Sequence, residues 1–145
     1  MILETVEETI VKYRLFEKGD RILLACSGGL DSTGLLAVFL ELRQEWHLDL
    51  YLGHFNHRLR PGAVEDEQFV RRIAREKAIP LFAASEDVRS LAKKERLNLE
   101  EAGRMLRYDF LAQTAKKIGG AKIATGHTMN DQAETFLLRI MKGVV

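Results

Sequence analysis

A run of small and polar residues, Ser27 to Thr33 (SGGLDST), follows an apolar segment and has the composition of a phosphate-binding turn. Gly28 and Gly29 lack a Cβ, so the backbone there can approach a ligand closely. Backbone N–H groups at the start of a helix attract anions, and the hydroxyl groups of the run add further donors. The alternative is an ordinary strand–helix turn, in which a serine caps the helix and Asp31 complements the helix dipole. No lysine follows the glycines, which excludes the GxxxxGK[ST] loop.

A second polar cluster, HFNHRLR, occupies residues 54–60. Its two histidines, His54 and His57, are three residues apart and suggest a metal pair. Because no cysteine and no third ligand lie nearby in the sequence, we favour a role without metal for both. His57 is interpreted equally well as a solvated loop histidine or as a residue of a binding site.

A third cluster, GHTMNDQAET, occupies residues 126–135 and contains His127 and Asp131, which are one helical turn apart. An imidazole and a carboxylate at this spacing are candidates for a catalytic or metal-binding site. Thr128 and Asp131 also resemble a variant capping box, which would give both of them a structural role at a helix start.

A predicted helix over about residues 98–118 carries two arginines on one face. At 100° per residue, Arg104, Arg107 and Tyr108 lie together, and Leu111 lies with them. The opposite face is apolar and contains Leu99, Ala102, Leu106 and Phe110. One interpretation is a solvated face on which arginine stems cover apolar surface. The other is an arginine clamp for phosphate or carboxylate, and Leu111 favours this for Arg107 because it indicates partial burial.

Strand-like and helix-like segments alternate around these clusters. The predicted strands are residues 21–26, 48–55, 80–84 and 121–126, and the predicted helices are residues 2–15, 30–45, 64–78, 98–118 and 129–142. Parallel strands need such helical crossovers, so the pattern predicts an α/β fold, a doubly wound parallel sheet with helices on both faces. Ligands of such sheets bind at the carboxyl ends of the strands, where the three polar clusters would converge.

Composition sets the limits of this interpretation. The chain has 145 residues, a hydrophobic fraction of 46% and a charged fraction of 30%, which predicts one globular domain over residues 1–145. The net charge of +1 provides no overall basic field for nucleic acid. Cys26 is the single cysteine and is expected in the core, so neither a disulfide within the chain nor a CxxC site is available. No apolar run is long enough for a membrane span, and we expect a cytoplasmic protein with no membrane partner.

Four blocks of sequence resemble known motifs. SGGLDS resembles the pyrophosphate loop of the N-type ATP pyrophosphatases. Three further blocks resemble motifs of the tRNA(Ile)-lysidine synthetase family, in the family's order. They are residues 57–61 (HRLRP, for HxLRP), 104–108 (RMLRY, for RxxRY) and 126–135 (for GHxxxDQxET). Ala63 stands where the family often has a serine, so the following helix is expected to lack a side-chain cap.

The resemblance implies an adenine-nucleotide α-hydrolase-like (Rossmann-like) fold and an ATP-dependent ligase that adenylates the wobble cytidine of tRNA(Ile) and joins lysine to C2. It implies the anticodon loop of tRNA(Ile) and L-lysine as partners and ATP and Mg²⁺ as cofactors. Asp31, Arg107, His127 and Asp131 would be catalytic, and Asp31 and Asp131 would hold the metal. The residues implied in ATP binding are Ser27, Gly28, Gly29, Leu30, Asp31 and Ser32.

Two other functions remain open. One is another PP-loop pyrophosphatase, a tRNA thiolase or an amide-forming synthetase, and the second is a nucleotide-binding domain without catalysis. The chain ends on Lys142-Gly143-Val144-Val145, where the family continues Arg-Gly-Ser-Gly, and we expect a fragment that lacks the family's C-terminal part. We therefore expect residues 1–145 to bind ATP–Mg²⁺ without forming lysidine at a useful rate. The oligomeric state is open, and a homodimer is compatible with the sequence.

Overall fold

A computed structural model describes residues 2–27, 30–58, 62–128 and 136–142. It contains a five-stranded sheet in the order β3-β2-β1-β4-β5. The strands are β1 (Arg21–Ala25), β2 (Asp49–Asn56), β3 (Leu81–Ser85), β4 (Lys122–Thr128) and β5 (Phe136–Lys142). The helices are α1 (Ile2–Tyr13), α2 (Leu30–Trp46), α3 (Ala63–Glu76), α4 (Val88–Glu95) and α5 (Leu99–Lys117). β1 to β4 are parallel, which confirms the predicted fold class.

The strand order reverses at β1. From β1 the chain builds outward through β2 to β3, and it then returns to place β4 on the other side of β1. The register sets Leu23 of β1 between Tyr51 of β2 and Ile123 of β4. Because the crossovers diverge at this point, the carboxyl ends of β1 and β4 leave a crevice between them, which is where open α/β sheets bind ligands.

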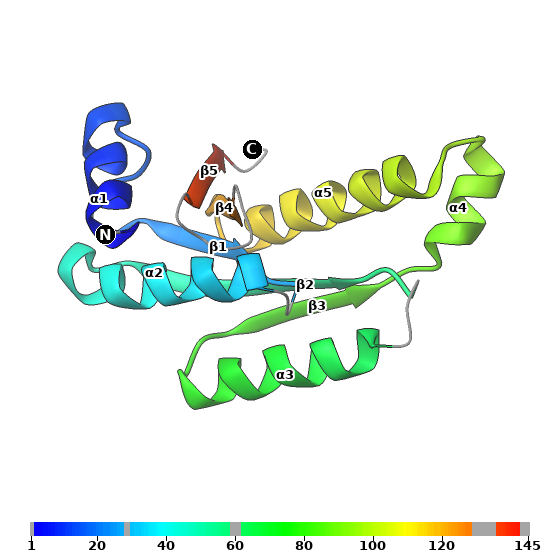
Figure 1. The fold of residues 1–145 in the computed structure, drawn as a ribbon, viewed down its shortest axis with the longest axis horizontal. Helices are drawn as coiled ribbons and strands as arrows, with labels where there is room; N and C mark the ends of the chain where they lie inside the picture. Colours follow the sequence, from blue (N-terminus) through cyan, green and yellow to red (C-terminus); the bar gives the residue numbers. More distant parts are fainter. Residues whose placement is uncertain (1, 28–29, 59–61, 129–135, 143–145) are drawn as a thin grey trace.

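Helices cover both faces of the sheet, α5 on one face and α2 and α3 on the other (Figure 1). The larger core cluster includes Phe39 of α2 and Val70 of α3, both fully buried. Cys26 also belongs to this cluster, as expected. On the other face, Leu111 of α5 packs against Leu23 of β1. These two layers fix the positions of β1, β2 and α5, whose ends form the site described below.

Local signals set the bounds of α5. Asn98 is its N-cap and accepts a hydrogen bond from the backbone N–H of Glu101 at 2.8 Å. Beyond the helix, Gly119 and Gly120 have φ values of +98° and +89°, a conformation that favours glycine and ends the helix. The helix predicted over about residues 98–118 is therefore confirmed. Gly62, before α3, makes no side-chain cap, as the alanine at position 63 led us to expect.

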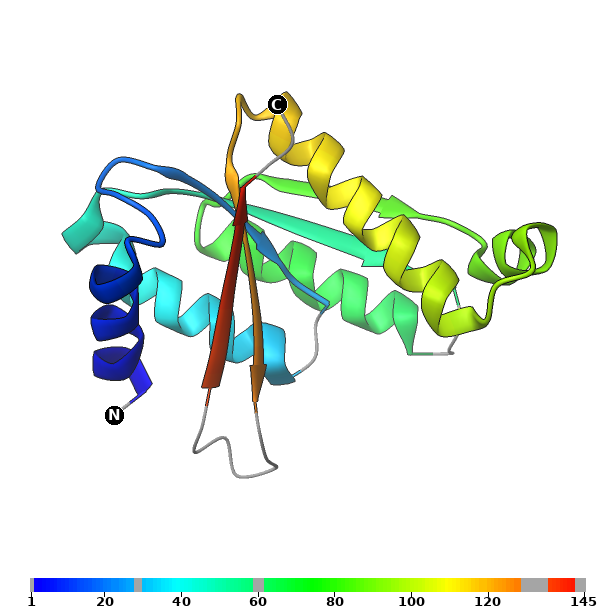
Figure 2. The ribbon, with the colours of Figure 1, turned by 90° about the horizontal axis from the view of Figure 1, so that it is seen from above.

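The predicted helix over residues 129–142 is wrong for residues 136–142. These residues form β5, which pairs antiparallel with β4 from Thr128–Phe136 to Lys122–Lys142 (Figure 2). The run FLLRIMK is short and largely apolar, and periodicity does not distinguish a buried helix from a buried strand over such a length. The open edge of β4 provides the backbone partners that favour the strand. Residues 129–135 lie outside the described residues.

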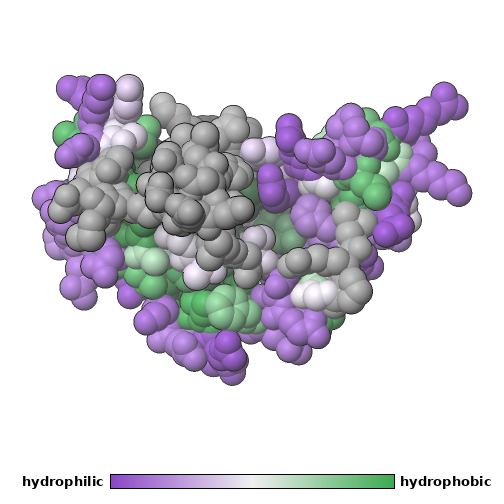
Figure 3. Space-filling view, viewed as in Figure 1, coloured by the Kyte–Doolittle hydropathy of each residue, from purple (hydrophilic) through white to green (hydrophobic). Residues whose placement is uncertain are grey.

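One helix, α4, was not predicted from the sequence. Asp87 is the N-cap of this helix. Its carboxylate accepts hydrogen bonds from the backbone N–H of Ser90 at 3.2 Å and from the hydroxyl of Ser90 at 2.9 Å. Val88 and Ala92 are its two buried residues, too few for a clear periodic signal. On the face shown in Figure 3, hydrophilic side chains lie around a smaller hydrophobic patch in the region of this helix. Within the described ranges, no helix has the length and apolar character needed to cross a membrane.

Candidate functional site

A cavity of about 290 Å³ opens where β1, β2 and β4 end. Ser27 lines it just beyond β1, His57 just beyond β2, and Thr125 from within β4. Arg107 and Tyr108 of α5 complete its polar wall. This is the position that the strand order predicts for a ligand, and the volume is close to the lower end of the usual range for small-molecule sites.

Arg107 reaches the cavity from the face of α5 that also carries buried Leu111. Its Nε atom is buried and has no hydrogen-bond partner, and its guanidinium lies 5.5 Å from the centre of the Tyr108 ring. A buried donor without a partner costs free energy, which an anionic ligand that accepts from it would recover. The structure thus places Arg107 at the cavity, and its role as an anion clamp stays a prediction.

Thr125 also lines this cavity and carries a second polar atom without a partner. Its Oγ1 atom is buried without a hydrogen-bond partner, and the residue is 8% exposed. Thr125 was not among the residues predicted from the sequence, although alternation along a strand places positions 125 and 127 on the same face of β4. Two residues that line one cavity thus carry unpartnered polar atoms, which favours a polar ligand there.

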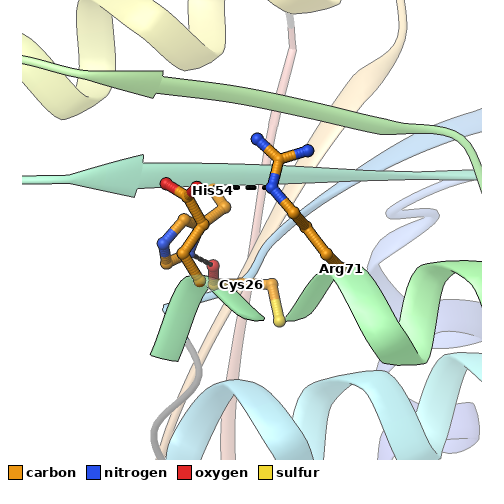
Figure 4. Close-up of polar contacts among 4 residues, drawn as sticks. Cys26, His54 and Arg71 are labelled. Carbon is orange, nitrogen blue, oxygen red and sulfur yellow. Dashed lines mark hydrogen bonds and ion pairs between the residues drawn. The ribbon is translucent and has the colours of Figure 1, made fainter. Parts of the chain in front are cut away.

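His54 has a structural contact. It is 3% exposed, and its Nδ1 atom lies 2.8 Å from the carbonyl oxygen of Cys26 (Figure 4). Because a carbonyl only accepts, this bond places the proton of His54 on Nδ1 and ties β2 to the end of β1. His54 and His57 are not joined by a third ligand among the described residues, where no group of three His, Cys, Asp or Glu side chains converges.

His57 stands at the rim of the cavity, half-buried. Its ring packs edge-on against Phe55, with ring centres 4.9 Å apart and planes at 79°. Burial lowers the pKa of His57, and the charge of Arg107 and the proximity of His54 lower it further. Neutral imidazole is therefore favoured, and of the two interpretations of His57 the structure supports the site residue.

The other predicted residues are placed as follows. Leu30, Asp31 and Ser32 are the first three residues of α2, so the predicted loop does join β1 to a helix start. His127 lies in β4 beside Gly126, which lines the cavity. Gly28, Gly29 and Asp131 lie outside the described residues. Arg104 is exposed and pairs with Glu100 at 3.7 Å, so the two arginines of α5 have different environments.

An open parallel sheet with a β1–α2 turn and a polar cavity at the switch point defines a nucleotide-binding α/β domain. The family model of the PP-loop domain matches residues 2–145. The chain belongs to this family of PP-loop domains, and ATP is the ligand that the family implies.

Similar proteins are named tRNA(Ile)-lysidine synthase. The protein of Caldanaerobacter subterraneus subsp. tengcongensis is 42% identical over 143 residues, which cover 98% of this chain and 31% of that protein. The protein of Clostridioides difficile is 41% identical over 144 residues, or 99% of this chain and 31% of that protein. The protein of Petrotoga mobilis is 41% identical over 147 residues, or 99% of this chain and 47% of that protein. The chain thus spans 31% to 47% of the length of these relatives.

Proposed function

We propose that this chain is the ATP-using domain of an enzyme that forms lysidine on tRNA(Ile). The observation that carries the proposal is the cavity at the switch point, with the unpartnered Nε of Arg107 and Oγ1 of Thr125 beside the turn into α2. The names of the similar proteins supply the substrate, since they share 41–42% identity over nearly the whole chain.

The reaction has two steps. In the first, the O2 atom of the wobble cytidine, in the anticodon loop, attacks the α-phosphorus of ATP and pyrophosphate leaves. In the second, the ε-amine of lysine attacks C2, the C2–O2 bond breaks, and AMP leaves with the electron pair. The backbone from Ser27 to Ser32 would hold the phosphates at the start of α2. Arg107 and His127 would stabilise the negative charge that develops on the phosphate oxygens and leaving groups.

We infer that two carboxylates of this chain would hold a divalent cation. Carboxylate oxygens are the ligands that Mg²⁺ prefers, and Asp31 stands in the first turn of α2, directly after the turn from β1. We assign Mg²⁺ to Asp31 together with Asp131. When bound, Mg²⁺ offsets the negative charge on the phosphates and the leaving pyrophosphate.

Substituting either carboxylate separates this assignment from the capping interpretation. Asp31→Asn and Asp131→Asn are each expected to abolish Mg²⁺-dependent turnover and to leave the melting temperature nearly unchanged. If the two residues instead serve as helix caps, the free energy of unfolding falls by about 0.5–2 kcal/mol and turnover continues. A thermal melt and a turnover assay on the same samples, over a range of Mg²⁺ concentrations, decide between the two results.

Pyrophosphate release tests the proposed function. With the protein expressed from its natural gene, release from ATP is expected to require tRNA(Ile), and full turnover to require lysine as well. Turnover with ammonia or a sulfur donor in place of lysine would support another PP-loop pyrophosphatase. Tight ATP binding with no release under any of these conditions would support a nucleotide-binding domain without catalysis, and either result contradicts the proposal.

A further inference from the structure

A second cavity of about 350 Å³ adjoins the first, along the N-terminal half of α5. Leu99, Glu100 and Arg104, all from the first two turns of α5, line it. His57 and Arg107 line both cavities and so form the boundary between them. A side chain at this boundary can contact a ligand in the first cavity and a second reactant that approaches through the other.

The position of the His57 ring is set by close packing against α5. Gly103 faces it, and a Cβ at position 103 would lie 3.0 Å from Nδ1 and 3.2 Å from Cε1 of His57. Gly103 is buried inside the helix, where glycine is an unfavourable choice unless another group needs the space. The ring therefore occupies the volume that a side chain at position 103 would take.

The backbone after His57 is held as well. Arg58 has a φ of 57°, a left-handed conformation that is uncommon for a residue with a side chain. Its backbone N–H donates to Oδ1 of Asn56 at 2.8 Å, and its guanidinium donates to Oγ of Ser85 in β3 at 3.0 Å. Together with Phe55 and Gly103, these contacts fix the imidazole at the boundary in advance of any ligand.

Few of the described side chains that line the two cavities can take up a proton near neutral pH. Arginine stays protonated, and the hydroxyl groups of serine, threonine and tyrosine are weak bases. Glu100 is a carboxylate whose side chain is 85% exposed and paired with Arg104. His57 is the remaining base, and it stands at the boundary itself.

We propose that His57 is the proton acceptor for the attacking amine, an inference that rests on the proposed function. An alkyl ammonium group has no free electron pair, so it must lose a proton before it can react. The proton passes to a ring nitrogen of His57, the freed electron pair forms the C2–N bond, and the C2–O2 bond breaks as AMP leaves. Gly103 acts as a positioning residue, because it lets the ring reach this place.

The charges around His57 suit this role. Arg107 and Arg104 reach its surroundings from α5, Arg58 follows it in the chain, and Glu100 is the one carboxylate among the described residues that line its two cavities. With His54 nearby on β2, the net charge of the groups around His57 is positive, which favours the neutral imidazole. The lowered pKa keeps the acceptor form populated at neutral pH, and the second step should slow as the pH falls through that pKa.

The test separates the two steps in His57→Gln, with His47→Gln as the matched control, since His47 is an exposed histidine between α2 and β2. Pyrophosphate release in the first turnover should stay within about threefold of wild type, and lysidine formation should fall about 10²-fold or more. The acid limb of the pH profile for the second step should disappear in His57→Gln alone.

Two further variants test the role of the ring and its position. In His57→Ala, added imidazole should restore part of the rate of the second step. Gly103→Ala should slow the second step with the first step retained.

The possible outcomes distinguish a failure of the inference from a failure of the proposed function. If His57→Gln forms lysidine at a rate within about threefold of wild type and keeps the acid limb, the inference is wrong while the proposed function stands. If the second step slows but imidazole gives no rescue and the acid limb remains, His57 has a packing role and the inference is also wrong. If wild-type protein releases no pyrophosphate with tRNA(Ile), the proposed function itself fails, and the inference fails with it.

Discussion

Arg107→Gln is expected to lower pyrophosphate release by about 10²–10³-fold, because removal of one donor that stabilises developing negative charge has an effect of this size. The same substitution should leave the free energy of unfolding unchanged or raise it slightly. In the free protein the Nε of Arg107 is buried without a partner, so its loss removes no hydrogen bond and relieves an unsatisfied donor. Steady-state turnover and urea denaturation measure the two quantities.

Arg89→Gln is the matched control, since Arg89 is an exposed arginine of α4 that lines neither cavity. It should change neither turnover nor stability. The opposite pattern for Arg107, normal turnover with a loss of stability, would show that its stem covers apolar surface and that the guanidinium has no ligand.

Gly28→Val and Gly29→Val are expected to abolish ATP binding while the fold is retained. A branched side chain at either position would fill the space in which the backbone approaches the phosphates, and valine also restricts the backbone. Calorimetric titration with ATP measures the loss, and circular dichroism with a thermal melt verifies the fold.

Gly62→Val provides the control for a glycine-to-valine change in a loop. Gly62 has a φ of −78°, and a Cβ there would meet no atom within 4 Å, so this variant should bind ATP as the wild type does. Normal ATP titration of both loop variants would show that residues 27–33 are a capped strand–helix turn and not the phosphate site.

Much of the fold was predictable because its signals are local. Near-continuous apolar runs such as residues 21–26 are typical of strands covered on both faces, and helical crossovers between them require a parallel sheet. β5 was not predictable in this way. Its strand conformation depends on pairing with β4, and no pattern within residues 136–142 indicates that partner. α4 depends on its Asp87 cap and on two buried residues, a signal too short for periodicity.

The part of the candidate site that α5 contributes was predictable, because helical spacing shows which residues share a face of that helix. Leu111 is fully buried, and Arg107 on the same face of α5 reaches the cavity while Arg104 stays exposed. Alternation along a strand would have placed Thr125 on the face of β4 that carries position 127, but the contact of His57 with α5 could not be predicted from the sequence. The contact of His57 with Gly103 joins the end of β2 to α5 across 46 positions, and no spacing rule relates such residues until the fold brings them together.

Mass spectrometry of tRNA(Ile) after incubation with the protein from its natural gene, ATP and L-lysine tests the central claim most directly. The wobble cytidine should gain the mass of one lysine less one water, and each modified tRNA should account for one AMP and one pyrophosphate. An unmodified wobble cytidine, or ADP and phosphate as the products of ATP, would contradict the account.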